Sequence, residues 1–448
     1  MLKRTMILAL MFGLIALATT ALADPLVLQG NENVYVDEVI NGLRAGDPAT
    51  VERDVQGNFD FGAPGSGQHP ITGGLDLQTF TLERHSGGTY DWENEFYMDL
   101  NQGDIVGGAG SRIRTIGNQY RSTADIVITN AGNISVETFS TTPHTTEHAG
   151  AVVVSHSGDF TADLISFSSN ANNRDTRGIQ IHGDGNGSFQ VGTIESRSSR
   201  LREYGVSIAN YDQVIVSDTF YVHSYGGWSI APGHPDIAIQ NIGSGGVWLP
   251  TVDAYVTGSI NAGHHGSHVI IDTLGSVNVD GDINTYSTSG SVNRYSGNVE
   301  ITAGESILIT GGVDSRQTAD LARSGNLTLT AGGTITLGSL DLDLLGDVTF
   351  QTGGGLGDWV WIQSEPLGLD VTNPSVSGFA GVNSHIYYHS EGLELSGNYD
   401  ILIDGDPSGF QLIELAQGQA PPSQPIPEPA GLSLLGMALL GLKRRRRS

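Results

Sequence analysis

The chain has 448 residues, including 62 glycines and no cysteine, and its formal net charge is −27. Without cysteine it can form no disulfide bonds, so burial and hydrogen bonding must stabilise the fold. A surface this acidic repels nucleic acid and anionic lipid, which excludes a nucleic-acid-binding role, and it attracts divalent cations. Adaptation to salty water explains the charge equally well. The many glycines and an aromatic content of 7% indicate numerous tight turns rather than a compact helical domain.

The first 23 residues have the layout of a secretory signal peptide. A basic start and an apolar run over residues 6–18 precede Ala21 and Ala23, which fit the small-x-small cleavage pattern. We therefore expect an N-terminal signal helix that is removed, so that the mature chain begins at Asp24. The alternative is a buried N-terminal helix.

An internal repeat is clearest near the middle of the chain. The segments SGNVEITAG (296–304) and SGNLTLTAG (324–332) are identical at six of nine positions and lie 28 residues apart. A second short strand follows each copy. Alternation places one set of apolar side chains on a common inner face, namely Val299, Ile301, Ile307 and Ile309 in the first copy and Leu327, Leu329, Ile335 and Leu337 in the second.

Weaker copies extend the repeat along the chain. Their strands start near residues 150, 178, 205, 236, 267 and 347, so successive starts are 22–31 residues apart when the two clear copies are included. Such a period suits coils of three short strands, and it predicts an all-β fold, a right-handed parallel β-helix. We expect Asn298 and Asn326, which share a register, to stack at a corner. The competing fold is a β-sandwich, whose strands recur at 8–12 residues.

The remaining segments complete a domain plan. After the signal peptide (1–23) we expect a β-rich N-terminal cap, the β-helix repeats of about 28 residues, a β-rich C-terminal cap, a flexible linker and a short tail. The boundaries are 24–122, 123–365, 366–419, 420–426 and 427–448, in that order. Within the C-terminal cap, a hairpin is predicted with its turn at 404–409.

The tail combines a Pro-Glu-Pro triplet, an apolar run and a basic end. The run from Ala430 to Leu442 has 13 residues. As a helix it would be about 20 Å long, against a hydrocarbon core of about 30 Å, so it makes a poor permanent anchor. It can nevertheless halt export with the body outside. The cations that would stay on the cytoplasmic side are Arg444, Arg445, Arg446 and Arg447.

This tail resembles the PEP-CTERM sorting domain. Pro427, Glu428 and Pro429, the run AGLSLLGMALLGL and the end KRRRR match its three parts in order. The resemblance implies export across the inner membrane of a Gram-negative bacterium that makes exopolysaccharide. It also implies transient residence in that membrane and cleavage at or near the triplet by an exosortase. The body resembles the β-helical repeats of filamentous-haemagglutinin-type and autotransporter adhesins in pattern only.

One stretch of the body is locally basic. Residues 24–426 keep 14 cations, all arginine, against 47 acids, because residues 1–23 carry 2 cations and residues 427–448 carry 5 cations and 1 acid. Five of the 14 arginines lie between 174 and 202. Stacked coils would bring these segments together, and they supply the candidates for a polysaccharide lyase or glycosidase site: Arg174, Asp175, Arg177, His182, Asp184 and Arg202. The alternative is ion pairing along a stack of loops.

Aspartate-rich turns are candidates for structural calcium, the one cofactor considered. Asp280 with Asp282 and Asp404 with Asp406 stand in Asp/Gly turns that offer carboxylate oxygens, but neither pair has the EF-hand spacing. The alternative is an ordinary turn between strands.

Taken together, the sequence predicts an exported structural or adhesive protein at the cell surface or in the exopolysaccharide matrix. Its partners would be an exosortase and an extracellular glycan. No nucleophile elbow, P-loop or dinucleotide fingerprint is present in the sequence, so a catalytic role is not expected. The alternative is a carbohydrate-active β-helix enzyme that uses the 174–202 region.

Overall fold

The structure, a computed structural model, describes ten stretches of the chain, with short strand segments before and after them. The stretches are 74–85, 95–117, 123–142, 150–169, 178–198, 205–224, 236–256, 267–285, 297–315 and 325–338. Every regular element in these residues is a β-strand. None of the described residues forms a helix that is long and apolar enough to cross a membrane. The predicted terminal helices, and therefore the sorting tail, lie outside these residues.

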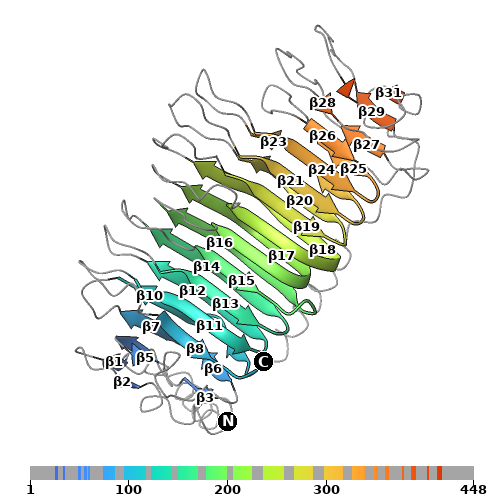
Figure 1. The fold of residues 1–448 in the computed structure, drawn as a ribbon. Helices are drawn as coiled ribbons and strands as arrows, with labels where there is room; N and C mark the ends of the chain where they lie inside the picture. The colour runs from blue at the N-terminus through green and yellow to red at the C-terminus, as the bar shows by residue number, and fades with distance from the viewer. Residues whose placement is uncertain are drawn as a thin grey trace, which may run out of the picture.

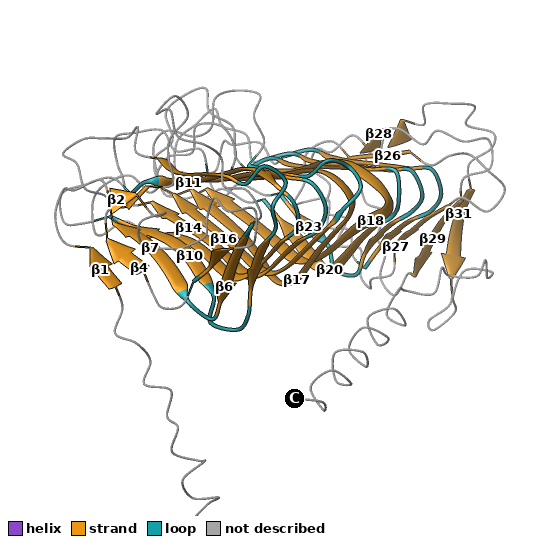
Figure 2. Cartoon of the chain, turned by 90° about the horizontal axis from the view of Figure 1, so that it is seen from below, coloured by secondary structure: helices purple, strands orange, loops and turns teal. Residues whose placement is uncertain are grey.

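The strands form one parallel solenoid with three faces, which we call A, B and C in the order in which each coil runs through them. Every strand pairing that the structure describes is parallel, and 29 strands belong to a single hydrogen-bonded sheet. Figure 1 shows the strands stacked in chain order along one axis, and Figure 2 shows the same stack from below. The predicted coil of three short strands is therefore confirmed.

Each face is a stack of strands from successive coils. Face A contains β8 (Glu95–Asp99), β11 (Asp125–Ala131), β13 (Val152–His156), β15 (Ile179–His182), β19 (Val269–Thr273), β21 (Val299–Ala303), β24 (Leu327–Ala331), β26 (Val348–Gln351), β28 (Val376–Ser377) and β30 (Ile401–Leu402). Face B contains β3 (Ala49–Thr50), β6 (Leu75–Gln78), β9 (Ile105–Gly107), β22 (Ile307–Ile309), β25 (Ile335–Leu337), β27 (Trp359–Ile362), β29 (His385–His389) and β31 (Gln411–Leu415). Face C contains β1 (Leu26–Leu28), β4 (Val55–Gly57), β7 (Thr81–His85), β10 (Arg112–Ile116) and β23 (Val313–Asp314).

The central strands are long enough to bend round corners. Four of them cover faces B and C, namely β12 (Ile134–Thr142), β14 (Phe160–Ser169), β16 (Ser188–Ser198) and β20 (Val277–Asn284). Two cover all three faces, namely β17 (Val206–Ser224) and β18 (Ile237–Val256). A separate two-stranded sheet pairs β2 (Val34–Tyr35) with β5 (Phe59–Asp60). Between residues 85 and 325, each undescribed segment follows a strand of face C and precedes a strand of face A.

The predicted register is confirmed at the clear repeat. Val299 pairs with Leu327 and Ile307 pairs with Ile335, as the 28-residue offset requires. All eight apolar residues of this register are buried. Since side chains alternate along a strand, the inner positions of every coil stack on the same axis and form one continuous core.

Polar ladders hold the corners. The backbone N–H of Asn326 donates to Oδ1 of Asn298 at 3.0 Å, which confirms the predicted stacking of this pair. A similar ladder runs between the faces A and B of earlier coils, where the N–H of Asn133 donates to Asp104 and that of Asp159 donates to Asn133. These bonds satisfy backbone groups that leave the sheet at the turn.

Some corners admit only glycine because adjacent coils touch there. A Cβ atom on Gly297 would lie 1.5 Å from the carbonyl oxygen of Ser267, which is far inside any contact distance. The glycines of the two S-G-N segments, Gly297 and Gly325, thus mark the places where these two coils start against the coil before them.

The solenoid is longer at both ends than the repeat predicted. Parallel pairing already includes β7 and β10, upstream of the expected start at residue 123. Downstream, β30 pairs with β28 and β31 pairs with β29, all in parallel. The predicted hairpin across residues 404–409 is therefore wrong, because each of its strands pairs with the preceding coil rather than with its neighbour in sequence.

Candidate functional site

Face C carries two adjacent outward-facing rows of polar and aromatic side chains. On β16, β17 and β18 the inward residues Ile194, Phe220 and Val252 are fully buried. Alternation therefore turns the next residues outward, and they pair across the strands as Glu195, Tyr221 and Asp253. Two residues further along, a second row pairs Arg197, His223 and Tyr255 in the same way. We call these six residues the face C cluster.

Three aromatic rings meet in this cluster. The rings of Tyr221 and Tyr255 lie edge to face, with centroids 5.9 Å apart and an interplanar angle of 74°. The His223 ring is edge-on to both, at 5.8 Å from Tyr221 and 6.4 Å from Tyr255. Each such pair adds about 0.5–1.5 kcal/mol beyond its burial, so the rings hold one another in a fixed arrangement.

Hydrogen bonds fix the polar ends of the same side chains. The Tyr255 hydroxyl donates to Oδ1 of Asp253 at 2.6 Å, and Nδ2 of Asn284 donates to the same oxygen at 2.8 Å. The Tyr221 hydroxyl is hydrogen-bonded to Nδ1 of His223 at 2.8 Å. Asp253 is thus oriented before any ligand arrives.

Arg197 supplies the positive charge of the cluster. Its guanidinium carbon lies 5.1 Å from the centre of the Tyr221 ring, and its terminal nitrogen lies 3.5 Å from Oε2 of Glu195. The two side chains are 46% and 34% exposed, so this is a solvated pair of small energetic value. Burial lowers the pKa of His223, and the Arg197 charge lowers it further. The imidazole is therefore neutral at neutral pH, and two carboxylates face one cation.

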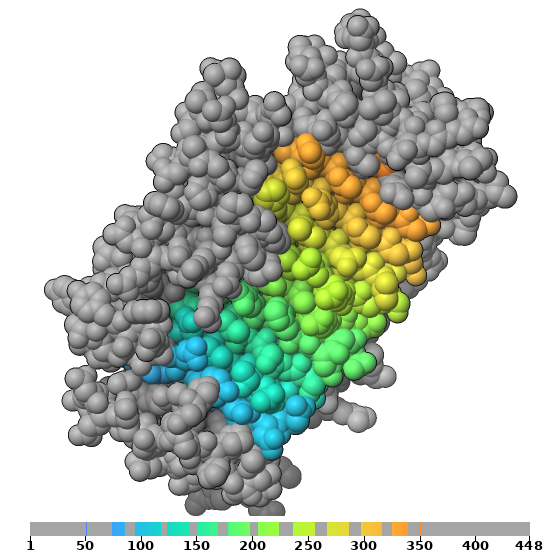
Figure 3. Space-filling view, in the orientation of Figure 1, coloured from blue at the N-terminus to red at the C-terminus, as the bar shows by residue number. Residues whose placement is uncertain are grey.

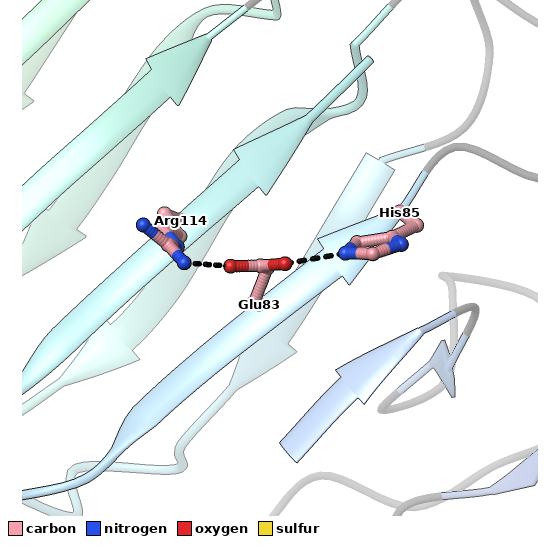
Figure 4. Close-up of polar contacts among 3 residues, drawn as sticks. All are labelled: Glu83, His85 and Arg114. Atoms are coloured by element: carbon pink, nitrogen blue, oxygen red, sulfur yellow. Dashed lines mark hydrogen bonds and ion pairs between the residues drawn. The ribbon is translucent and has the colours of Figure 1, made fainter. Parts of the chain in front are cut away.

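A second cluster lies further toward the N-terminus on face C. Glu83 on β7 is opposite Arg114 on β10, and Figure 4 shows the carboxylate between Arg114 and His85. One carboxylate oxygen contacts the His85 ring, and the other forms an ion pair with Arg114 without hydrogen-bond geometry. Burial opposes ionisation of Glu83, but the His85 hydrogen bond and the Arg114 charge outweigh it and lower its pKa. Because Glu83 is buried, this cluster reads as a structural contact between coils.

Of the six residues predicted from sequence, only His182 and Asp184 lie in the part of the chain that the structure describes. His182 lies at the end of face A, with Nε2 3.3 Å from Oγ of Ser207, and burial lowers its pKa. Asp184 lies in the turn toward face B, where it accepts a 3.1 Å bond from the N–H of Asn186. Arg174, Asp175, Arg177 and Arg202 lie outside the described residues.

The described calcium candidates bridge neighbouring coils. Asp280 accepts a hydrogen bond from Thr310 Oγ1 at 3.3 Å, and Asp282 accepts one from the N–H of Gly312 at 2.7 Å. Across the described stretches, no group of three or more His, Asp or Glu residues is placed to hold a metal ion. Asp404 and Asp406 lie outside the part that the structure describes.

Sequence reasoning missed the face C cluster. The available signal was the pair of segments YVH (221–223) and DAY (253–255), in which outward residues two positions apart are aromatic or ionisable. The three-residue segment ESR (195–197) precedes YVH by one coil and DAY by two. Only the strand register places the three segments side by side.

No known protein family matches the chain, and no curated protein or solved structure is detectably similar to it. The class of the protein therefore rests on its own geometry, which is that of an all-β parallel solenoid. Figure 3 shows one long side of it, on which the surface residues follow chain order.

Proposed function

We propose that this protein is an exported structural or adhesive solenoid that contacts extracellular glycans in the cell envelope or the exopolysaccharide matrix. The observation that carries the proposal is the face C cluster, a preorganised group of aromatic and carboxylate side chains on a rigid parallel sheet. Rigid elements present a binding group more accurately than loops do. A rod that offers several weak contacts gains avidity without any single strong one.

The proposed route to that location uses both ends of the sequence. The signal peptide directs export, and an exosortase cuts the sorting tail near Pro427, Glu428 and Pro429 after a transient stay in the inner membrane. The mature body then has 47 acids and 14 arginines. We infer a right-handed winding, because crossovers between parallel strands of one sheet are right-handed in about 98% of cases.

The sorting proposal is tested by the intact mass and location of the mature protein, with and without the sorting protease. We expect a chain that begins at Asp24 and ends near residue 427 in cells that have the protease. Retention of the C-terminal residues 443–448 in the mature protein would contradict this route.

A glycosidase is the second candidate, and one observation favours it. Glu195 and Asp253 face outward on the same row, two strand spacings apart. Two spacings are roughly 9–10 Å, near the upper end of the carboxylate separation in inverting glycosidases, about 6.5–9.5 Å. Incubation with neutral and acidic polysaccharides, followed by assays of reducing ends and of unsaturated products, tests it. Products that persist in Glu195→Gln and Asp253→Asn would exclude this pair.

A further inference from the structure

We propose that the face C cluster is a binding site for neutral sugar residues of a polysaccharide and that it discriminates against uronates. The inference rests on the glycan contact proposed above and adds a defined site and a ligand class. Export and tail processing can fail without affecting it.

The aromatic part of the cluster matches the shape of a pyranose. A sugar ring has an apolar face of C–H groups and a rim of hydroxyls. Arg197 already lies over the Tyr221 ring, and Tyr221 and Tyr255 meet at 74°, so a sugar that stacks on Tyr255 has Tyr221 beside its rim. The two rings come from neighbouring coils, which fixes their separation through the sheet itself.

The polar part supplies acceptors for hydroxyl donors. Asp253 has one oxygen held by Tyr255 and Asn284, so its carboxylate is oriented, and among the described residues its second oxygen has no hydrogen-bond partner. Hydrogen bonds to an ionised acceptor are stronger than those between neutral groups. Glu195 offers a second carboxylate two strands away on the same row. Vicinal hydroxyls of a hexose are donors of the kind that such carboxylates bind.

Charge decides between neutral and acidic sugars. The cluster has two carboxylates and one guanidinium, and that guanidinium already has Glu195 at 3.5 Å. The body around it has 47 acids against 14 arginines. A uronate would bring a further negative charge to a negative site, which lowers both its association rate and its affinity.

Affinity electrophoresis of the mature protein tests the site, in gels that contain a neutral β-glucan, a neutral galactomannan or alginate as the acidic probe. We expect retardation by at least one neutral polymer and none by alginate. Tyr221→Ala should weaken the retardation about tenfold, since one lost ring contact of this size corresponds to about that factor in affinity. Glu195→Gln keeps the size of a side chain that is only partly exposed, so the fold stays intact, and it should weaken the retardation several-fold.

Tyr97→Ala is the matched control, because Tyr97 is a partly exposed tyrosine on face A whose hydroxyl bonds Thr129 at 3.0 Å. It should bind as the unchanged protein does. Binding that Tyr221→Ala and Glu195→Gln leave unchanged would overturn this site while leaving a glycan contact elsewhere on the rod. Stronger retardation by alginate, or none by any polymer, would overturn the ligand class.

Discussion

Replacing Glu83 by alanine tests whether the buried contact on face C ties neighbouring coils together. The change leaves Arg114 and His85 without the carboxylate that lies between them. Exposed ion pairs contribute about 0–1 kcal/mol, whereas removing one partner of a fully buried pair costs about 3–5 kcal/mol. Glu83 is 6% exposed, but Arg114 is 31% exposed and can be rehydrated. We therefore expect a cost between these limits, about 2–3 kcal/mol.

Hydrogen exchange measured by mass spectrometry is the suitable assay, because coils of a solenoid can open separately. A cost of 2–3 kcal/mol should speed exchange in β7 and β10 by roughly 30- to 150-fold. Glu300→Ala is the control, since Glu300 is an exposed glutamate on β21, and it should change exchange little. Exchange in β7 and β10 within threefold of the unchanged protein would refute the reasoning.

The pH dependence gives an independent check on the same residue. The pKa of Glu83 is lowered in the folded state, so its contribution is present above the unfolded pKa and is lost as the pH falls through the folded value. The difference between the unchanged protein and Glu83→Gln should therefore shrink in strong acid. A difference that stays constant down to pH 2 would show that the charge is not what matters.

Two further predictions concern the core and one buried acid. Phe189→Ala should lower the free energy of unfolding by about 3–5 kcal/mol, because Phe189 is fully buried and its ring stacks on Phe160 with centroids 5.2 Å apart. Thr161→Ala, on the exposed side of the same sheet, should be nearly neutral. Equal urea midpoints for the two variants would contradict this prediction. Burial raises the pKa of Asp236 to about 7, and the neighbouring Ser267 side chain and His268 backbone offset this only in part. The unfolded chain loses this proton near pH 4 and the folded chain near pH 7, so stability falls as the pH rises across that range. The thermal midpoint of Asp236→Asn relative to the unchanged protein should accordingly rise from pH 4 to pH 8, and an unchanged difference would contradict the prediction.

Much of the fold could be predicted because a solenoid repeats one local rule. Apolar residues such as Val299 and Leu327 recur at the same place in each coil, so their alternation and the 28-residue offset together specify both the inner face and the register. The corner asparagines Asn298 and Asn326 follow from the same offset. The length of the solenoid was underestimated at both ends because the terminal coils do not copy the repeat. Parallel strands can pair when their backbones match in shape, even where their sequences differ.

The candidate site was less predictable for a physical reason. His182 and Asp184 attracted attention because ionisable residues are dense in that segment, yet they lie on face A and in the turn after it. The face C cluster is assembled from three coils, and none of its segments is unusual alone.

By itself, the sequence determined the inner half of this protein. Alternating apolar residues at a period near 28 can be buried only by stacking coil upon coil, and the glycine at a position such as Gly297 is required by the closeness of those coils. The outer half was decided by the tertiary structure. Bulges in β17 and β18 shift the pairing before face C. Tyr221 therefore lies opposite Asp253, 32 residues away, whereas on face A Val206 lies opposite Ile237, 31 residues away. The outward neighbours on face C therefore depend on how the whole coil bends.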